Sequence, residues 1–147
     1  MLAAFKQQSQ QAPIAFSSIN PHAIIPYQKI QDQGHYQNQH TLLWQNRFNQ
    51  DQSGVEVLTP VAIDGQKSWL IVDRGFIATS NNTVPSIKPA QNPALINGTI
   101  YPLDHQGFSI GPDILPPQQG YEMIQKVNIH KLQHLLKHPL MPFMLHL

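Results

Sequence analysis

The sequence predicts a β-rich α+β domain, in which about six mostly antiparallel strands close toward a barrel-like sheet between short N- and C-terminal helices. Three observations favour this fold class. Thirteen prolines, several of them in Asn-Pro and Pro-Pro pairs, divide the chain into short segments. These segments are rich in β-branched and aromatic residues that partly alternate with polar ones. Finally, Asp64-Gly65 stands between two apolar runs, and this pair is typical of a tight hairpin turn.

The composition indicates one domain and excludes several classes of function. A chain of 147 residues can bury a core without disulfides, so we expect a single domain over residues 1–147. The formal charge is +1 and only 12% of the residues are charged, which leaves no basic stripe for phosphates. Nucleic acid is therefore not expected as a partner. The sequence has no cysteine, which excludes disulfides, thiolate catalysis and cysteine-ligated zinc.

Both ends of the chain are apolar. Residues 2–12 contain strong helix formers and predict a short helix, within a helical lead-in that we place at residues 1–16. The last segment, PLMPFMLHL, is apolar as well. No run reaches the ~20 apolar residues that span a bilayer, and no signal-peptide pattern is present. We therefore expect a soluble segment excised from a longer protein.

The β core is expected over residues 24–128. The apolar and aromatic runs predict six strands, at residues 24–37, 40–48, 55–63, 66–78, 95–103 and 121–128. Residues 79–94 and 109–120 are rich in proline and small polar residues and are interpreted as loops. Gly98 stands in the middle of the fifth strand, where it indicates a bulge or a close backbone approach.

The hairpin at Asp64-Gly65 predicts a definite register. A two-residue type I′ turn would pair Ile63 with Gln66 and Pro60 with Trp69, the latter as a non-hydrogen-bonded pair that tolerates proline. One face then carries the valines of residues 55–61 and also Arg74. On the other face Glu56 would lie across from Asp73, an unfavourable like-charge pair. A cation from a neighbouring strand, or a bulge at Gly54 or Gly75, would be needed to relieve it.

A histidine-rich helix is predicted near the end of the chain. Asn128 is a good N-cap for a helix at residues 129–138, which Pro139 would end. Its histidines fall within about 80° of arc, opposite the leucines, and they are His130, His134 and His138. Two histidines four residues apart are able to bind a transition metal, but a solvated polar face is the favoured interpretation. The other histidines show no ligand spacing and are interpreted as surface residues: His22, His35, His40, His105 and His146.

One catalytic pattern can be set aside. Residues 107–111, GFSIG, match the G-x-S-x-G pattern of a nucleophile elbow around Ser109. That elbow requires a helix after the serine, and Pro112 and Pro116 oppose an ordinary helix there. A turn-rich loop is the preferred interpretation. No coherent set of acid, base and nucleophile is recognisable, so we expect no enzyme.

Four segments match motifs that occur together in one known family. YQKIQDQGHYQ is similar to a strand ending in glycine and an aromatic residue, SGVEVLTPV to Gly-x-x-Val-x-Thr-Pro, WLIVDRGFIA to Val-Asn-Arg-Gly-Trp-Val-Pro, and INGTIYPL to Val-x-Gly-x-Leu. With this order and spacing, about residues 24–145 resemble the Surfeit locus family of cytochrome c oxidase assembly factors. The chain departs from the motifs at Asp73, Phe76 and Ala78, where Asn, Trp and Pro are usual.

The resemblance implies a function that composition does not reveal. Members of this family are membrane-anchored assembly factors for haem–copper oxidases, assisting maturation or the insertion of haem a into subunit I. One membrane helix precedes this domain and another follows it, on the periplasmic side of the bacterial inner membrane or in the mitochondrial intermembrane space. Partners would be oxidase subunit I and other assembly factors. Haem a would be held by a membrane helix absent here, so no cofactor is expected in this chain.

The resemblance also selects residues. Gly34, Gly54, Pro60 and Gly98 match positions that need special backbone geometry, and Thr59 and Gly75 belong to the same motifs. Arg74 is the matched residue best suited to binding. It could pin strands through bidentate hydrogen bonds, which is the favoured role, or contact a haem propionate. The alternative function is a non-catalytic ligand-binding module that uses the histidine stripe for a transition metal.

Overall fold

The computed structural model describes residues 12–20, 23–80, 83–103 and 111–147. These residues form mainly strands, with one short α-helix and two 3₁₀ turns. In chain order the elements are η1 (Phe16–Ser18), β1 (Lys29–Tyr36), η2 (Asn38–His40), β2 (Leu42–Asn49), β3 (Gln52–Ile63), β4 (Trp69–Ala78), β5 (Ala94–Tyr101), β6 (Ile114–Gln118), β7 (Tyr121–Ile124), α2 (Ile129–Leu136) and β8 (Leu140–His146).

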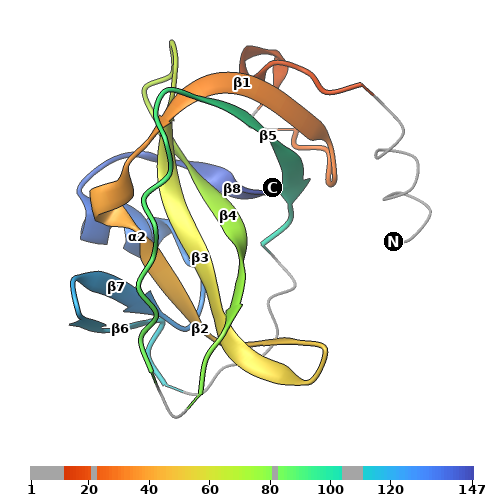
Figure 1. Ribbon diagram of the computed structural model, residues 1–147. Helices are drawn as coiled ribbons and strands as arrows, with labels where there is room; N and C mark the ends of the chain where they lie inside the picture. The colour runs from red at the N-terminus through yellow and green to blue at the C-terminus, as the bar shows by residue number, and fades with distance from the viewer. Residues whose placement is uncertain (1–11, 21–22, 81–82, 104–110) are drawn as a thin grey trace.

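Five strands close into a barrel. Their order is β1-β5-β8-β4-β3, and β3 pairs again with β1 to complete the ring. On the other side of β3 the sheet continues through β2, β7 and β6, as Figure 1 shows. Most pairs are antiparallel, whereas β2–β7 and β4–β8 are parallel. The predicted β-rich, barrel-like fold with a short helix near the end is confirmed.

The barrel interior is filled by apolar side chains from all five strands. Alternate residues of each strand point inward, because successive side chains of a strand lie on opposite faces. The buried set includes Ile30, Val61, Leu70, Ile96 and Leu145. Phe16 of η1 is only 2% exposed and its ring lies 6.1 Å from that of Phe143, so the segment before β1 covers one opening of the barrel.

A second core lies outside the barrel, beneath α2. The outward-facing residues Leu58, Ile71 and Met144 pack there against Leu132 and Leu136 of the helix. Asn128 caps α2, since its Oδ1 accepts a hydrogen bond from the Lys131 N–H at 3.1 Å. The predicted N-cap and the inward position of the leucines are therefore confirmed. Both faces of the β3–β4 hairpin are buried, which the alternating pattern of the hairpin alone does not reveal.

Two strands differ from the sequence prediction. Residues 109–120 were interpreted as a loop, but Ile114–Gln118 form β6 and pair with β7. Leu140–His146 form β8, a strand of the barrel, although only an apolar end was recognised there. Neither strand was recognised from the sequence, because proline lowers strand propensity. β6 contains Pro116 and Pro117, and β8 contains Pro142. Of the expected lead-in, residues 1–11 lie outside the described part, and Ile14 makes a parallel bridge with Ile30.

The predicted hairpin register is wrong by two residues. Ala62 pairs with Trp69 and Pro60 with Ile71, so residues 63–68 form a longer connection. A type I′ turn needs positive φ at both central residues, but only Gly65 has it, with φ of 81°. The Gln66 N–H still donates to the Ile63 carbonyl oxygen at 3.0 Å. Because the shift is even, the side chains of β4 from Trp69 to Asp73 stay on their predicted faces.

Two glycines allow neighbouring backbones to approach closely. Gly34 pairs with Ala94 of β5 and with Ile63 of β3, at the corner where β1 changes partners. A Cβ atom at Gly98 of β5 would lie 2.7 Å from the carbonyl oxygen of His146 in β8. The close backbone approach predicted at Gly98 is thus confirmed, and it holds β5 against β8 in the barrel.

We expect Gly98→Ala to destabilise the domain, because β8 backbone atoms must move to admit the methyl group. The loss should be about 1–3 kcal/mol in the free energy of unfolding, measured by urea denaturation. Asn97→Ala, at an exposed position of the same strand, is the matched control. If both variants lose the same small amount, the close approach does not constrain the barrel.

Candidate functional site

A bulge in β4 organises the polar residues of the barrel wall. Arg74 and Gly75 together lie opposite Val57 of β3, between the pairs Leu58–Asp73 and Glu56–Phe76. Gly75 has φ of 128°, which side-chain-bearing residues rarely adopt. Its N–H donates to Oδ1 of Asp73 at 2.9 Å. The relief predicted at Gly75 is therefore present, and it places Asp73 beside the bulge.

Two carboxyl groups and an imidazole meet on the outer side of the barrel wall. One possible ligand atom from each of Glu56, Asp73 and His146 lies within 4.8 Å of the others. Nε2 of His146 is 3.9 Å from Oδ2 of Asp73. Nε of Arg47 donates to Oε2 of Glu56 at 2.5 Å. Arg47 is the predicted cation from a neighbouring strand, although Glu56 pairs with Phe76 rather than with Asp73 as predicted.

The pKa of the Asp73 side chain is strongly shifted. Its side chain is 1% exposed, and burial is the main cause that raises its pKa to about 8. A hydrogen bond with Glu56 and the repulsion between the two carboxylates raise the pKa further, whereas the Gly75 N–H and Arg47 act against this. At neutral pH the pair therefore retains a proton.

This acidic group lies in a pocket of about 300 Å³. Tyr27, Trp44 and Tyr101 supply aromatic walls, and Met144 and Leu103 add apolar surface. The guanidinium of Arg47 lies 3.7 Å from the centre of the Trp44 ring. The Tyr101 ring is 5.3 Å from the His146 ring and 5.7 Å from the Tyr27 ring. The pocket therefore combines aromatic walls with a polar cluster, as ligand sites often do.

Arg74 lies on the opposite face of the wall and holds a loop. Its Nη2 donates to the carbonyl oxygen of Lys88 at 2.8 Å, and its Nη1 donates to Oγ1 of Thr59 at 3.3 Å. Thr59 also shares a hydrogen bond of 3.0 Å with Thr41. The guanidinium is 5.8 Å from the ring of Tyr36, whose pKa is raised by burial although Arg74 lowers it. These contacts fit the structural role that was favoured for Arg74.

The other motif residues shape the backbone around this wall. Pro60 lies where β3 changes partner from β2 to β1. The Pro60 carbonyl oxygen accepts from the Gln37 N–H at 2.8 Å, away from β4, so its nitrogen also faces away from β4. The predicted non-hydrogen-bonded pair with β4 therefore holds, with Ile71 as partner. Gly54 is buried where β3 crosses Ile77 and Ala78, and a Cβ atom there would collide with their backbone.

The three histidines of the predicted stripe do not come together. His130 and His134 lie on α2 with their rings 5.0 Å apart. The helix ends at Leu136 rather than at residue 138, because Lys137 adopts a left-handed conformation with φ of 55°. His138 therefore turns away and stacks on Trp69, with ring centres 3.7 Å apart. Within the described residues, Glu56, Asp73 and His146 are the one group of three side chains placed for a shared ion.

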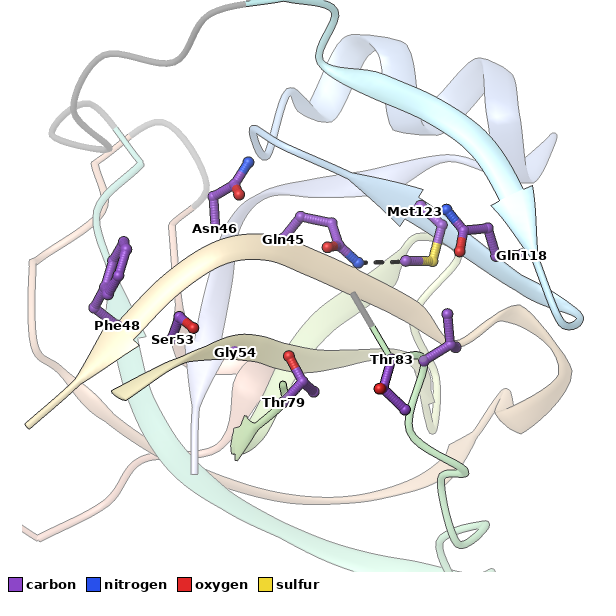
Figure 2. Close-up of a pocket in the computed structure, with 10 residues that line it drawn as sticks. Gln45, Asn46, Phe48, Ser53, Gly54, Thr79, Thr83, Gln118 and Met123 are labelled. Atoms are coloured by element: carbon purple, nitrogen blue, oxygen red, sulfur yellow. Dashed lines mark hydrogen bonds between the residues drawn. The ribbon is translucent and has the colours of Figure 1, made fainter. Parts of the chain in front are cut away.

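A second pocket, of about 350 Å³, is shown in Figure 2. Its wall comes from strands β2, β3, β6 and β7 and from the segment after β4. It is lined by amides, hydroxyls and a few apolar side chains: Gln45, Asn46, Phe48, Ser53, Gly54, Thr79, Thr83, Val84, Gln118 and Met123. The dashed line in Figure 2 joins Nε2 of Gln45 to the sulfur of Met123 at 3.9 Å. None of these side chains ionises near neutral pH, so this pocket offers no acid–base chemistry.

Ser109 of the GFSIG segment lies outside the described residues.

Comparison with known families gives a match to the SURF1 family over residues 1–147. The chain belongs to the SURF1 family. This family is the one that the sequence motifs resemble, and it is associated with cytochrome oxidase assembly. Neither the search of curated proteins nor the search of solved structures gave a match. No helix among the described residues is long and apolar enough to cross a membrane.

Sequence reasoning missed one member of the acidic cluster. His146 was grouped with surface histidines, because a lone histidine in an apolar segment shows no ligand spacing. Parallel pairing of β8 with β4, with Asp73 opposite His146, brings it to the site. The expected clash between Glu56 and Asp73 was the available signal, since a tolerated like-charge pair indicates a cation or a shared proton.

The pKa of Asp73 predicts a pH-dependent stability. The folded chain holds the proton up to about pH 8, whereas an unfolded aspartate releases it near 3.8. The folded state thus binds more protons between these values, so stability is full at low pH and falls as pH rises. We expect a slope approaching 1.4 kcal/mol per pH unit between about pH 5 and 7. Urea denaturation with a chelator present measures it, and Asp73→Asn should show a much flatter profile.

Arg74→Lys should loosen the loop before β5, because lysine lacks the planar two-nitrogen fork with which Arg74 bonds Thr59 and the Lys88 carbonyl oxygen. Amide hydrogen exchange of Ile87 and Ala90, which bond Tyr121 and Asn38, should become about five- to tenfold faster. Lys88→Ala is the matched control, because it keeps the carbonyl acceptor. Equal effects of the two substitutions would argue against the Arg74 contact.

Proposed function

We propose that this domain belongs to a membrane-anchored assembly factor that assists the insertion of haem a into subunit I of a haem–copper oxidase. The domain lies outside the cytoplasm and acts without catalysis, as a docking or gating surface for the oxidase subunit and for other assembly factors. Membrane helices before and after it hold it at the bilayer, and one of them contributes the haem contact.

The match to the SURF1 family over residues 1–147 is the observation that carries this proposal. The positions of the shared motifs in the structure support it. Two motifs pack together on the β3–β4 hairpin. One supplies Thr59 and Pro60, and the other supplies Arg74 and Gly75. The motifs therefore maintain a particular wall of the barrel and the loop above it. Such a role suits a binding surface better than a reaction centre.

The test is a reduced-minus-oxidised spectrum of membranes from the native host, after deletion of the full-length gene and after its restoration. We expect the a-type haem band to fall several-fold on deletion and to return with the wild-type gene. Restoration with Arg74→Ala should return less of the band than restoration with Lys88→Ala, provided that both proteins accumulate equally on immunoblots. An unchanged band, in a host without a second copy, would contradict the proposal.

The haem step is separated from other assembly steps by a second measurement. Subunit I is isolated from the deletion strain, and its haem a is compared with its polypeptide. Loss of haem a per polypeptide supports a role in insertion. Normal haem a in a reduced amount of subunit I would instead indicate that the protein protects or matures the subunit at another step.

A further inference from the structure

We propose that Glu56, Asp73 and His146 form a binding site for one divalent transition-metal cation of the Zn²⁺ type. The three residues line the aromatic pocket, on the outer face of the barrel wall. It is distinct from the histidine stripe of α2, and it does not depend on the function proposed above.

The donors have the right chemistry and nearly the right spacing. Carboxylate oxygens and imidazole nitrogens both bind Zn²⁺, and three protein ligands leave a fourth position for water or a ligand. The three atoms lie within 4.8 Å of one another, and Asp73 Oδ2 is 3.9 Å from His146 Nε2. Bonds of about 2.0–2.2 Å require donors roughly 3.4 Å apart, so a small contraction completes the site. His146 is 40% exposed and can rotate, whereas Asp73 is fixed.

The imidazole of His146 is oriented as a metal ligand requires. Its Nδ1 lies 3.0 Å from the main-chain oxygen of Leu147. This main-chain oxygen only accepts, so the contact places the ring proton on Nδ1 and leaves the lone pair on Nε2. That lone pair faces Asp73. Metal-binding histidines characteristically donate their other N–H to a carbonyl or carboxylate in this way.

The buried carboxyl group of Asp73 depends on the cluster for the partner of its second oxygen. Oδ1 accepts from the Gly75 N–H, which accounts for one oxygen. Oδ2 lies 3.9 Å from Nε2 of His146, and the carboxyl group also hydrogen-bonds with Glu56. A carboxyl group that is 1% exposed normally has all its oxygens satisfied, because an unsatisfied one is costly. A metal ion at this position would replace the proton that Asp73 and Glu56 share and would serve as the partner of Oδ2.

Arg47 limits the charge of the site without blocking it. Its Nε contacts Oε2 of Glu56, and its guanidinium stacks on Trp44. Oε1 of Glu56 is not occupied by Arg47. With both carboxylates ionised, the two negative charges exceed the single positive charge of Arg47, and a divalent cation is attracted. Mg²⁺ should bind much more weakly, because it prefers six oxygen ligands and keeps its waters.

The test is calorimetric titration of the metal-free 147-residue chain with Zn²⁺, at neutral pH and with Mg²⁺ as the comparison. We expect one Zn²⁺ per chain. Asp73→Asn and His146→Gln should each weaken binding at least tenfold, whereas the double variant His130→Ala/His134→Ala should bind as the wild type does. Asp73→Asn should fold, because an asparagine oxygen still accepts from Gly75, and His146→Gln provides a second variant.

The outcomes are distinct. Weakened binding in both site variants, with the helix variant unaffected, supports the proposal. Binding lost in the helix variant and retained in Asp73→Asn would overturn it and assign the metal to α2. No measurable binding to the wild-type chain at millimolar Zn²⁺ would overturn it as well. Chemical shifts of the His146 ring, followed by NMR during the titration, locate the ion without any substitution.

Discussion

The bulge at Arg74 and Gly75 is the constraint on which the polar features of this domain depend. One extra residue in β4 reverses the alternation of its side chains beyond that point, so Ile77 joins Val55 and Val57 in a third apolar cluster. Before the bulge, Ile71 and Asp73 share the outer face with the core beneath α2. A regular strand would have placed Ile77 on the face of Asp73 and disrupted both clusters.

The length of β3 is the second requirement, because this strand is shared between two parts of the sheet. Its first half pairs with β2 and its second half with β1, while β4 runs along its other edge. Figure 1 shows β3 extending across the whole molecule. Pro60 occupies the change of partner, where a missing N–H costs least. The barrel and its extension thus depend on one strand with a proline at its division.

The sequence was sufficient for what local chemistry decides, and insufficient for what distant pairing decides. Asp64-Gly65, the capped leucine helix and the glycine in β5 could each be recognised from neighbouring residues. The register of the hairpin could not be predicted correctly. A type I′ turn requires a positive φ at Asp64, but only Gly65 has one, and residues 63–68 form a longer connection. β8 could not be recognised either, since its strand character comes from two partners, β4 and β5, rather than from its proline-containing sequence. For the same reason, the sequence alone did not place His146 at the site.

The fold needs the Asp73 side chain as a hydrogen-bond acceptor, but it does not need the group to be ionisable. Its fold-supporting contact is acceptance of the Gly75 N–H, and an amide oxygen would accept that bond equally well. The motif that the chain resembles has asparagine at this position, in agreement with that argument. The second, ionisable oxygen adds a group beside Glu56 whose raised pKa makes folding less favourable as the pH rises. A group that the scaffold does not need, and that opposes its stability, is best explained by an interaction with something positively charged.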